Sequence, residues 1–538
     1  MIHPYPSDID LTRPDKFTDP FRYRPHPLVT LAAESLMERI RSSSELSGIF
    51  AEGKMLGVLA VAYGLEFKQT GYLAGFSGLA GGKSVVNGFV PPIYDLTAPD
   101  GHYKTRESEI SAINNEISEL SSSSELEELR AKMETAKHVM SEELSAQKKR
   151  MEELKAERDL IRKGIIDEEL AKELTRQSQF EKAQLRRLKS HWEETVESIR
   201  SRIREIEDRI TELKHLRKEM SDNLQEWIFR QYRVHDFNGN ELSISDIFKS
   251  NGLVPPGGTG ECAAPKLLEY AYRNGMKPLA MGEFWYGTSP DTAVRTEGHF
   301  YPSCTSKCGP LLGYMTQGLE IAKETAIHGS PEIIYEDDDI VVAHKPSGMP
   351  SVPGLNGACS LQEWIAEKTG CQEIESVHRL DMDTYGVMLF AKNSAAGSDI
   401  RRQFEEHSVR KVYRAILSPT GKGNINKGES GFISLPLSPD YDERPRQKAD
   451  LHQGKEALTE YHVDDILADG SIRVTYFPLT GRTHQLRVHS AHHLGMGHAI
   501  KGDLLYGGAD AQHLCLHAAE IEFTLPSSGQ RVTFSDKV

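Results

Sequence analysis

The segment SVHRLDMDTYGVMLFAKN, residues 376–393, is the most informative part of this chain. It places two carboxylates, Asp381 and Asp383, beside the basic pair His378 and Arg379, and it ends in an apolar run that predicts a buried strand. A carboxylate next to an arginine is usually a plain ion pair of small energetic weight. The tetrapeptide HRLD therefore indicates chemistry only if the surrounding segments point the same way.

Further blocks flank this segment in a fixed order. They are DDDIVVAHKPSGMPSVPG (337–354), RKVYRAIL (410–417), ERPRQKAD with GKEALTEY (443–461), LTGRTHQLRVHSAHHLGMGHAIKGDLLYG (479–507) and LCLHAAEIEFTLP (514–526). Together they resemble the catalytic domain of the RluA-type pseudouridine synthases, and the resemblance covers residues 331–538. The RPRQKA and GKEALTEY pieces bring it closest to the branch that acts on short stem-loops in ribosomal and transfer RNA.

The resemblance assigns the chemistry to three side chains. Asp381 stands where the family has its catalytic aspartate, Tyr413 where it has the active-site tyrosine, and Arg487 where it has the arginine that pairs with the aspartate. Such a pair keeps a carboxylate ionised and oriented. The implied reaction breaks the C–N glycosidic bond of uridine, turns the uracil and rejoins it through carbon, without a cofactor or a catalytic metal. The carboxylate can be the nucleophile or can assist proton removal from the sugar, and the sequence leaves both routes open.

Arg379 and His378 are expected to take part in base flipping. A uridine has to leave the base stack before its base can be reached, and a side chain that fills the gap offsets part of the unstacking cost. The resemblance implies this role for Arg379; a plain phosphate contact is the alternative. Asp383 occupies a position that the family does not reserve for catalysis, so we expect it to be structural or solvated.

Two expectations concern local structure near these residues. The segment GRTHQLRVH is interpreted as a strand, which would place Thr483, Gln485, Arg487 and His489 on one face. Where the family usually has Thr-Ser-Gly after the aspartate, this chain has the bulkier Tyr385. The packing of the loop has to differ there.

Basic residues in the same blocks are the candidates for RNA contact. Guanidinium groups can pair bidentately with phosphate oxygens. The net charge of −15, with 29 Asp and Glu against 21 Lys and Arg in residues 331–538, argues against nonspecific coating of nucleic acid, so an RNA surface has to be concentrated. The expected contacts are Arg401, Arg402, Arg410, Lys411, Arg414, Arg444, Arg446 and Lys448.

Composition divides the 538 residues into four regions. Residues 1–100 form an N-terminal globular region, and residues 233–330 return to globular composition and could continue the same domain. Residues 331–538 alternate strand-like segments with short helices, which predicts an α+β catalytic domain on a mixed or antiparallel sheet. More than one domain is expected because single cores rarely grow beyond about 300 residues.

Residues 101–232 predict a long helical coiled-coil hairpin. They hold almost no glycine or proline and repeat short heptad-like pieces of Glu, Lys, Arg, Leu and Ile. A turn at residues 163–167 would leave two antiparallel helices of about 60 residues, each about 90 Å long. An intermolecular coiled coil is the alternative. A protein or ribosomal partner is expected at this element.

Two other motifs suggest different chemistry. The run SGLAGGKSV (77–85) lacks the first glycine of a phosphate-binding loop, which favours a glycine-rich turn. Cys262, Cys304 and Cys308 with His299 could supply four zinc ligands, and they faintly resemble a nucleobase deaminase motif. Their spacing fits neither a zinc knuckle nor that motif, so buried free cysteines are expected and no metal is predicted.

The sequence thus predicts an isomerase that converts specific uridines to pseudouridine in structured RNA, as a step of rRNA or tRNA processing. The alternatives are an RNA-binding or ribosome-assembly factor that retains the synthase fold, and a scaffold dominated by the coiled coil. No apolar run approaches the roughly 20 residues that span a bilayer. The N-terminus does not resemble a secretory signal, and six cysteines in this length form no disulfide framework, so a cytoplasmic location is expected.

Overall fold

The computed structural model divides the chain into two compact units. One unit comprises Met1–Asp95 together with Phe229–Val538, and the other comprises Leu96–Ile228. The structure describes residues 1–5, 12–96, 101–165, 167–290, 293–322, 327–354, 358–421, 424–441, 443–508 and 511–536.

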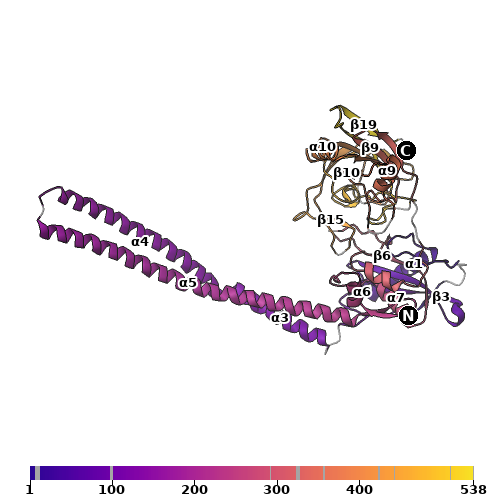
Figure 1. The fold of residues 1–538 in the computed structure, drawn as a ribbon. Helices are drawn as coiled ribbons and strands as arrows, with labels where there is room; N and C mark the ends of the chain where they lie inside the picture. The colour runs from indigo at the N-terminus through magenta and orange to yellow at the C-terminus, as the bar shows by residue number, and fades with distance from the viewer. Residues whose placement is uncertain are drawn as a thin grey trace. The chain divides into compact units, whose positions relative to one another are not determined.

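A ten-stranded mixed sheet is the framework of the C-terminal region, as predicted (Figure 1). Its strand order is β13-β16-β17-β12-β18-β11-β9-β8, with β10 on β11 and β19 on β18. β11 and β18 run parallel, and the other strand pairs of this sheet in the described residues are antiparallel. The strands are β8 (Glu332–Glu336), β9 (Ile340–Lys345), β10 (Glu375–Ser376), β11 (Tyr385–Ala391), β12 (Arg410–Leu417), β13 (Ser430–Ser434), β16 (Leu458–Ile466), β17 (Ile472–Pro478), β18 (Leu516–Thr524) and β19 (Arg531–Ser535).

Short helices and a small ribbon complete this region. They are α9 (Leu361–Thr369), α10 (Ser394–Glu405), α11 (Gln485–Ala491), β14 (Leu437–Pro439) and β15 (Gln447–Ala449). Helix α9 begins with a capping box, in which Ser360 and Glu363 satisfy each other's backbone N–H groups, and ends at the left-handed Gly370. Such local signals explain why α9 has sharp limits.

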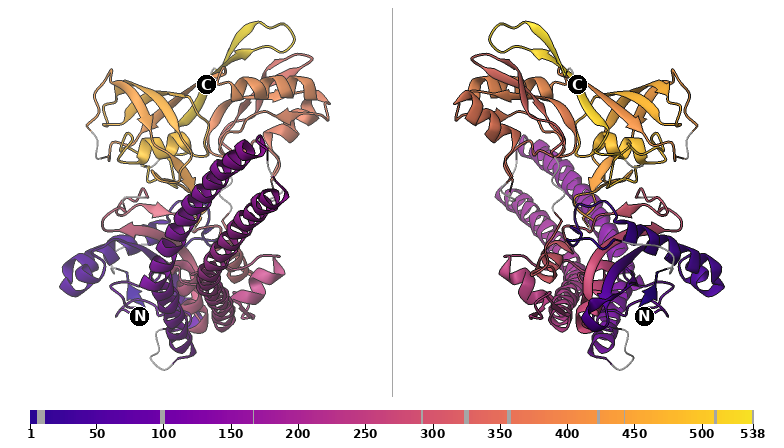
Figure 2. Two further views of the ribbon diagram at one scale, coloured as in Figure 1. Left: turned by 90° about the vertical axis from the view of Figure 1, so that its left-hand side faces the viewer. Right: turned by 90° about the vertical axis from the view of Figure 1, so that its right-hand side faces the viewer.

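A second sheet combines residues from before and after the helical hairpin. Its order is β1 (His3–Pro4), β3 (Gln69–Phe76), β2 (Lys54–Tyr63), β6 (Lys277–Tyr286) and β7 (Phe300–Tyr301). β2 pairs antiparallel with β6 over most of its length, so residues 1–95 and 233–322 share one sheet (Figure 2). Helices α1 (Pro27–Ser42) and α7 (Ala263–Arg273) pack on it.

The remaining elements near this sheet are short. They are α2 (Ser44–Ile49), the 3₁₀ turn η1 (Leu65–Phe67), β4 (Arg233–His235), β5 (Glu241–Ser243), α6 (Ile244–Ser250) and α8 (Gly309–Met315).

The second unit is a helical hairpin in which α3 (His102–Ser121) and α4 (Ser124–Arg162) lie along α5 (Glu168–Gln231) (Figure 1). Two small apolar clusters hold the arms together, one around Ile206 and Ile210 and one around Met133 and Val196. Although α5 has 64 residues, no helix in the described part of the chain is long and apolar enough to cross a membrane.

The first arm of the hairpin differs from the prediction of one helix of about 60 residues, because it breaks at Ser122. The side chain of Ser123 accepts a hydrogen bond from the backbone N–H of Leu126 and starts α4 as its N-cap, which competes with a continuous helix. Helix α4 ends at Arg162 and α5 begins at Glu168, around the predicted turn; residue 166 of that turn lies outside the described residues.

The interpretation of GRTHQLRVH as a strand is wrong, because Gln485–Ala491 is helix α11. The strand β17 ends at Pro478, and His484 then adopts a left-handed conformation with φ of 53°. All seven residues of α11 are buried, so alternation of polar and apolar residues carries no information about their conformation.

Candidate active site

The HRLD segment connects β10 to β11, and the KPSG turn holds it from one side. The Ser351 hydroxyl donates to the carbonyl of Leu380 (2.7 Å) and accepts from the Leu380 N–H (3.2 Å). The Ser347 hydroxyl donates to the carbonyl of Asp383 (2.8 Å). The backbone on both sides of Asp381 is therefore fixed by hydroxyl groups from a neighbouring turn.

The buried side chain of Lys345 also holds this turn, through hydrogen bonds to backbone carbonyls. Its side chain is fully buried, and its Nζ donates to the carbonyls of Pro346 (3.1 Å), Met349 (2.7 Å) and Met382 (2.8 Å). Burial lowers the pKa of Lys345 to about 7, while the nearby Asp381 acts in the opposite direction. Lys345 ties the turn to the residue that follows Asp381.

The Asp381 carboxylate is partly exposed, with 24% of the side chain accessible. Its Oδ2 lies 3.6 Å from Nη1 of Arg487 and 3.8 Å from Nε2 of His484. Burial raises the pKa of Asp381 above its ordinary value, Arg487 counteracts this, and the carboxylate of Asp503 adds to the increase. Asp381 is a poorly solvated carboxylate that still has access to a ligand.

Arg487 has its strongest partner in Asp503, not in Asp381. Its Nε and Nη2 donate to the two oxygens of Asp503 at 2.8 and 2.7 Å, and both side chains are buried. Burial works to raise the pKa of Asp503, but Arg487 outweighs it and the pKa lies below its ordinary value. The bidentate pair aims the remaining nitrogen of Arg487 at Asp381.

Tyr413 lies on β12 at a bulge, opposite Tyr476 of β17 and Ala518 of β18. Burial raises the pKa of the Tyr413 hydroxyl, and the charge of Asp381 raises it further. The phenol is therefore neutral near pH 7. The structure brings Tyr413, Arg487 and Asp381 together.

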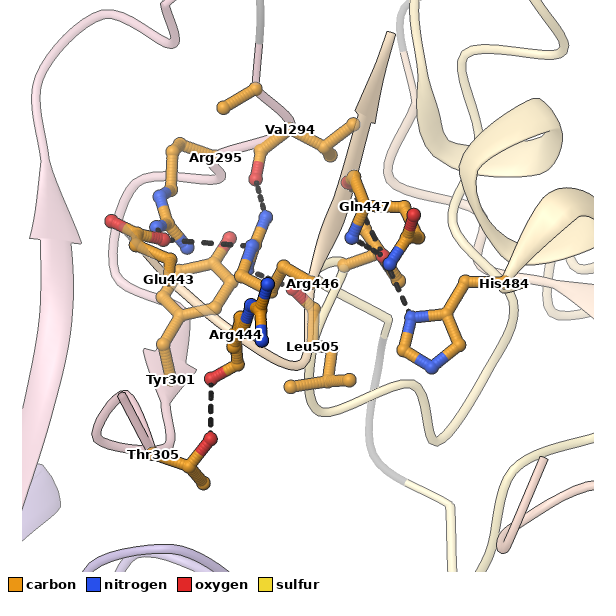
Figure 3. Close-up of polar contacts among 12 residues, drawn as sticks. Val294, Arg295, Tyr301, Thr305, Glu443, Arg444, Arg446, Gln447, His484 and Leu505 are labelled. Carbon is orange, nitrogen blue, oxygen red and sulfur yellow. Dashed lines mark hydrogen bonds and ion pairs between the residues drawn. The ribbon is translucent and has the colours of Figure 1, made fainter. Parts of the chain in front are cut away.

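His484 is a neighbour of Asp381 that the sequence analysis did not single out. Its Nδ1 lies 2.9 Å from the Tyr506 hydroxyl, which also accepts from the backbone N–H of Gln447 at 2.8 Å (Figure 3). Burial lowers the pKa of His484 well below its ordinary value. A neutral imidazole therefore connects this network to Asp381.

Arg379 and His378 differ in environment. Arg379 is exposed, and among the described residues no hydrogen bond or ion pair involves its side chain. His378 points inward: its Nε2 accepts from the Leu389 N–H (3.0 Å), and its ring lies 5.2 Å from that of Phe404. Burial, with Lys411, lowers the pKa of His378 to about 3. The geometry favours a structural role for His378.

The loop after the aspartate accommodates its unusual tyrosine by stacking. The ring of Tyr385 lies parallel to that of His517, with centroids 4.8 Å apart and an angle of 8°. Gly386 adopts a φ of 118°, and a Cβ there would lie 2.2 Å from the carbonyl oxygen of Ala518. Asp383 forms an ion pair with Arg22 at 2.7 Å.

Several expected RNA contacts already have acidic partners at the surface. Arg401 pairs with Glu375 and Arg402 with Asp399. Arg410 lies 4.0 Å from Glu522, and Arg414 lies 3.2 Å from Glu520. Such exposed pairs are weak and can exchange a carboxylate for a phosphate.

The basic residues of the segment 444–448 differ in how deeply they are buried. Arg446 is buried and donates to the carbonyls of Leu505 and Val294, the latter at 2.9 Å (Figure 3). Arg444 is exposed, with its guanidinium over the Tyr441 ring. Lys448 is half-buried. Lys411 is also half-buried, and burial lowers its pKa to about 8.

The residues missed by the sequence analysis lie inside the blocks it quoted. Asp503 is the aspartate of the KGD segment, His484 belongs to GRTHQLR, and Lys345 is the lysine of KPSG. A lysine in a predicted buried strand was the one local signal, because an unpaired buried ammonium is costly. The partnership of Arg487 with Asp503 could not be read from spacing.

Comparisons with known proteins match the C-terminal region of the chain. A family model described as RNA pseudouridylate synthase matches residues 339–492. The dual-specificity RNA pseudouridine synthase RluA of Haemophilus influenzae is 40% identical over 212 residues, which cover 38% of this chain and 92% of that protein. RluA of Escherichia coli K12 is 41% identical over 206 residues, covering 38% and 90%.

Among solved structures, human RNA Pseudouridylate Synthase Domain Containing 1 shares 26% sequence identity with this chain. The match covers 40% of this chain and 86% of the human one, with a TM-score of 0.33.

Proposed function

The chain belongs to the RluA-type RNA pseudouridine synthases and isomerises uridine in RNA, and we propose that Asp381 is the residue on which this isomerisation depends. One observation carries the proposal. Asp381 is a partly exposed, poorly solvated carboxylate facing a guanidinium that a second, buried carboxylate holds in place.

In the proposed site each neighbour of Asp381 has a separate role. Arg487 keeps the carboxylate ionised and oriented through the contact at 3.6 Å. Tyr413 stacks on the detached uracil, and its neutral hydroxyl can transfer a proton at the base. Asp381 acts either as the nucleophile at the sugar or as the acceptor of a sugar proton.

Base flipping belongs to Arg379 in this proposal. Within the described part of the chain its exposed side chain has no partner, so it can enter an RNA stack without breaking an existing contact. His378 then supports the loop from within. Phosphate contacts are assigned to the exposed or half-buried basic side chains, namely Arg401, Arg402, Arg410, Lys411, Arg444 and Lys448.

The test is the single-turnover rate of pseudouridine formation on a stem-loop RNA with Asp381→Asn. We expect a loss of about 10⁴-fold, the scale seen when a reacting group is removed, with RNA affinity changed less than about threefold because the charge lies among buried neighbours rather than at a phosphate. Asp383→Asn is the matched control, because it removes an equal charge two residues away and should keep the rate.

The same measurement decides between an enzyme and an RNA-binding factor. If wild type turns over and Asp381→Asn does not, catalysis at Asp381 is supported. Equal product from wild type and Asp381→Asn would refute that assignment. The assembly-factor alternative would be favoured if wild type bound RNA tightly but did not convert any uridine that is modified in the host.

The RNA target is proposed to be a stem-loop found in both ribosomal and transfer RNA. The relatives RluA are named dual-specificity synthases, and they match this chain over nine-tenths of their length. Pseudouridine maps of both RNA classes should be compared in cells that lack the protein and in cells that carry wild type or Asp381→Asn. Loss of sites in one class alone would contradict dual specificity.

The hairpin of residues 96–228 is proposed to bind a protein or ribosomal partner. Its helices expose charged faces along most of their length, and Ile165 near its turn is fully exposed. Replacing residues 96–228 by a flexible linker should leave turnover on a short stem-loop intact and abolish association with ribosomal particles. Unchanged association and unchanged target choice in cells would contradict this role.

A further inference from the structure

Three cysteines from two separated segments meet in the N-terminal body, the part of the globular unit formed by residues 1–95 and 229–322. Cys262 is the N-cap of α7, Cys304 lies in the loop after β7, and Cys308 precedes α8. Their sulfur atoms all lie within 4.8 Å of one another, and all three are free thiols. Among the described residues they form the one cluster of potential metal ligands, and His299 is not part of it.

The spacing of the sulfurs suits a thiophilic ion. A tetrahedral zinc ion with zinc–sulfur bonds of about 2.3 Å holds its sulfurs about 3.8 Å apart. Thiolate ligands select soft or borderline ions such as zinc over magnesium or calcium.

Glu283 braces both ligand-bearing segments. From β6 it accepts the N–H of Ala264 at 3.2 Å, two residues after Cys262, and the hydroxyl of Ser303 at 2.6 Å, one residue before Cys304. Its two oxygens are thereby occupied in fixing the cysteines. Residues that hold the ligands in this way are a regular part of metal sites.

We propose that Cys262, Cys304 and Cys308 bind one zinc ion as thiolates, in a site separate from the chemistry of uridine isomerisation. Three protein ligands leave one tetrahedral position for an exchangeable ligand, the arrangement of zinc sites that bind water or substrate. A cavity of about 430 Å³ adjoins the cysteines, and Glu283, Arg295, Tyr301 and Arg444 contribute to its lining. All three cysteines line this cavity, so an exchangeable ligand can reach a bound ion from it.

The loop of residues 304–308, which carries two of the proposed zinc ligands, also contacts the segment of residues 443–448. Thr305, between Cys304 and Cys308, donates both its N–H and its hydroxyl to the carbonyl of Arg444 at 3.0 Å (Figure 3). Arg295 pairs with Glu443 beside it. The ion therefore stabilises a loop on which the placement of residues 443–446 depends.

The first test is the zinc content of the purified full-length protein and its Cys304→Ser variant. We expect about one zinc per wild-type chain and less than about a tenth of that in the variant, because two thiolates hold zinc poorly. The control is Cys359→Ser, which changes an exposed cysteine outside the cluster and should keep the metal. No zinc in wild type, or full zinc in Cys304→Ser, would overturn the proposal.

A second measurement on wild type alone covers the case in which Cys304→Ser does not fold. Alkylation followed by mass spectrometry should find Cys262, Cys304 and Cys308 protected with zinc present and reactive after chelation, and Cys359 reactive in both states. A disulfide between any two of the three, or equal reactivity in both states, would refute the site.

Cobalt substitution of the full chain tests the open position. Cobalt should show the strong visible bands of a tetrahedral thiolate site, and added azide should shift them by replacing water. Bands that azide does not change would show a closed fourth position and contradict this part of the proposal.

Discussion

At the level of single residues, the proposed site contains one carboxylate to which we assign the reaction and a second one that orients Arg487. Asp503 is buried and pairs bidentately with Arg487, and its pKa lies below the ordinary value. Asp381 is partly exposed and lies farther from the same guanidinium, and its pKa lies above the ordinary value. Two carboxylates around Arg487 thus have opposite environments. Such a division is typical of sites in which one group reacts and another orients.

The first prediction concerns the stability of Asp381→Asn. Because folding raises the pKa of Asp381, its ionised form costs stability; the penalty is absent below the ordinary pKa and complete above the raised one. The variant should therefore be more stable than wild type at pH 7, by about 0.5–2 kcal/mol as is common at active sites. Denaturant unfolding at pH 7 and pH 4 measures this. A lower stability of the variant at pH 7 would contradict it.

The second prediction is the acid limb of the pH–rate profile. If the ionised carboxylate of Asp381 reacts, the single-turnover rate should fall as pH drops through a value above the ordinary aspartate pKa. His484 stays neutral over this range because its pKa is well below its usual value, so it adds no second limb near pH 6.5. A limb at pH 6.5 that His484→Gln removes would reassign the titration to the imidazole.

The third prediction compares Asp503→Asn with Asp383→Asn. Removing the Asp503 charge takes away the bidentate partner of the buried Arg487 and leaves only its longer contact with Asp381, which should cost about 3–5 kcal/mol of unfolding free energy. The pair of Asp383 with Arg22 is a quarter to a third exposed, and its loss should cost less than about 1 kcal/mol. Chemical denaturation measures both, and equal losses would contradict the difference in burial.

At the scale of elements, the hairpin owes its shape to local signals and a few cross-arm contacts. Its break at Ser122 comes from the N-cap at Ser123, and its distal part contains a buried ion pair. Arg158 donates to Glu181 at 2.5 and 2.9 Å from α4 to α5. This pair sets the register of the two arms near the turn.

The fourth prediction is that Arg158→Ala loosens the distal hairpin. It leaves Glu181 buried without its partner, so amide exchange in residues 150–185 should rise about tenfold or more, equivalent to about 1.4 kcal/mol or more of local stability. The control is Arg200→Ala, which removes an exposed pair with Glu197 within α5. Unchanged exchange in Arg158→Ala would show that apolar contacts alone hold the arms.

At the scale of the whole globular unit, the N-terminal body supports the catalytic domain through Arg446. Its buried guanidinium joins the carbonyl of Val294 to that of Leu505, two residues after Asp503 (Figure 3). Gln447 follows it and reaches His484 through the Tyr506 hydroxyl. Residues 444–448 were expected to contact RNA, but Arg446 and Gln447 of this segment form contacts inside the protein.

The fifth prediction separates these two roles. Arg446→Met should lower kcat by about tenfold with little change in KM, because Asp503 and Arg487 lose their support. Arg444→Met, at the exposed neighbour, should raise KM and leave kcat, as expected for a phosphate contact. Steady-state kinetics on a stem-loop RNA distinguishes them, and a change in KM alone for Arg446→Met would contradict the bracing role.

The sequence was sufficient to recognise the reaction class, because ordered blocks along the chain resemble those of one enzyme family, and the proposed site residues lie in those blocks. HRLD with Asp381, the strand with Tyr413 and the segment with Arg487 could be found along the chain, as could the α+β class and the helical region. These are local patterns, in which residue order and periodicity reflect loops, strands and helices directly.

Which groups face one another could be learned only from the folded structure. The partnership of Arg487 with Asp503, the inward orientation of His378 and Arg446, the helix in place of a strand at Gln485–Ala491 and the meeting of Cys262 with Cys304 and Cys308 all depend on packing between distant segments. Burial and neighbouring charges then set the pKa values, and both depend on every group packed nearby and not on the adjacent residues alone.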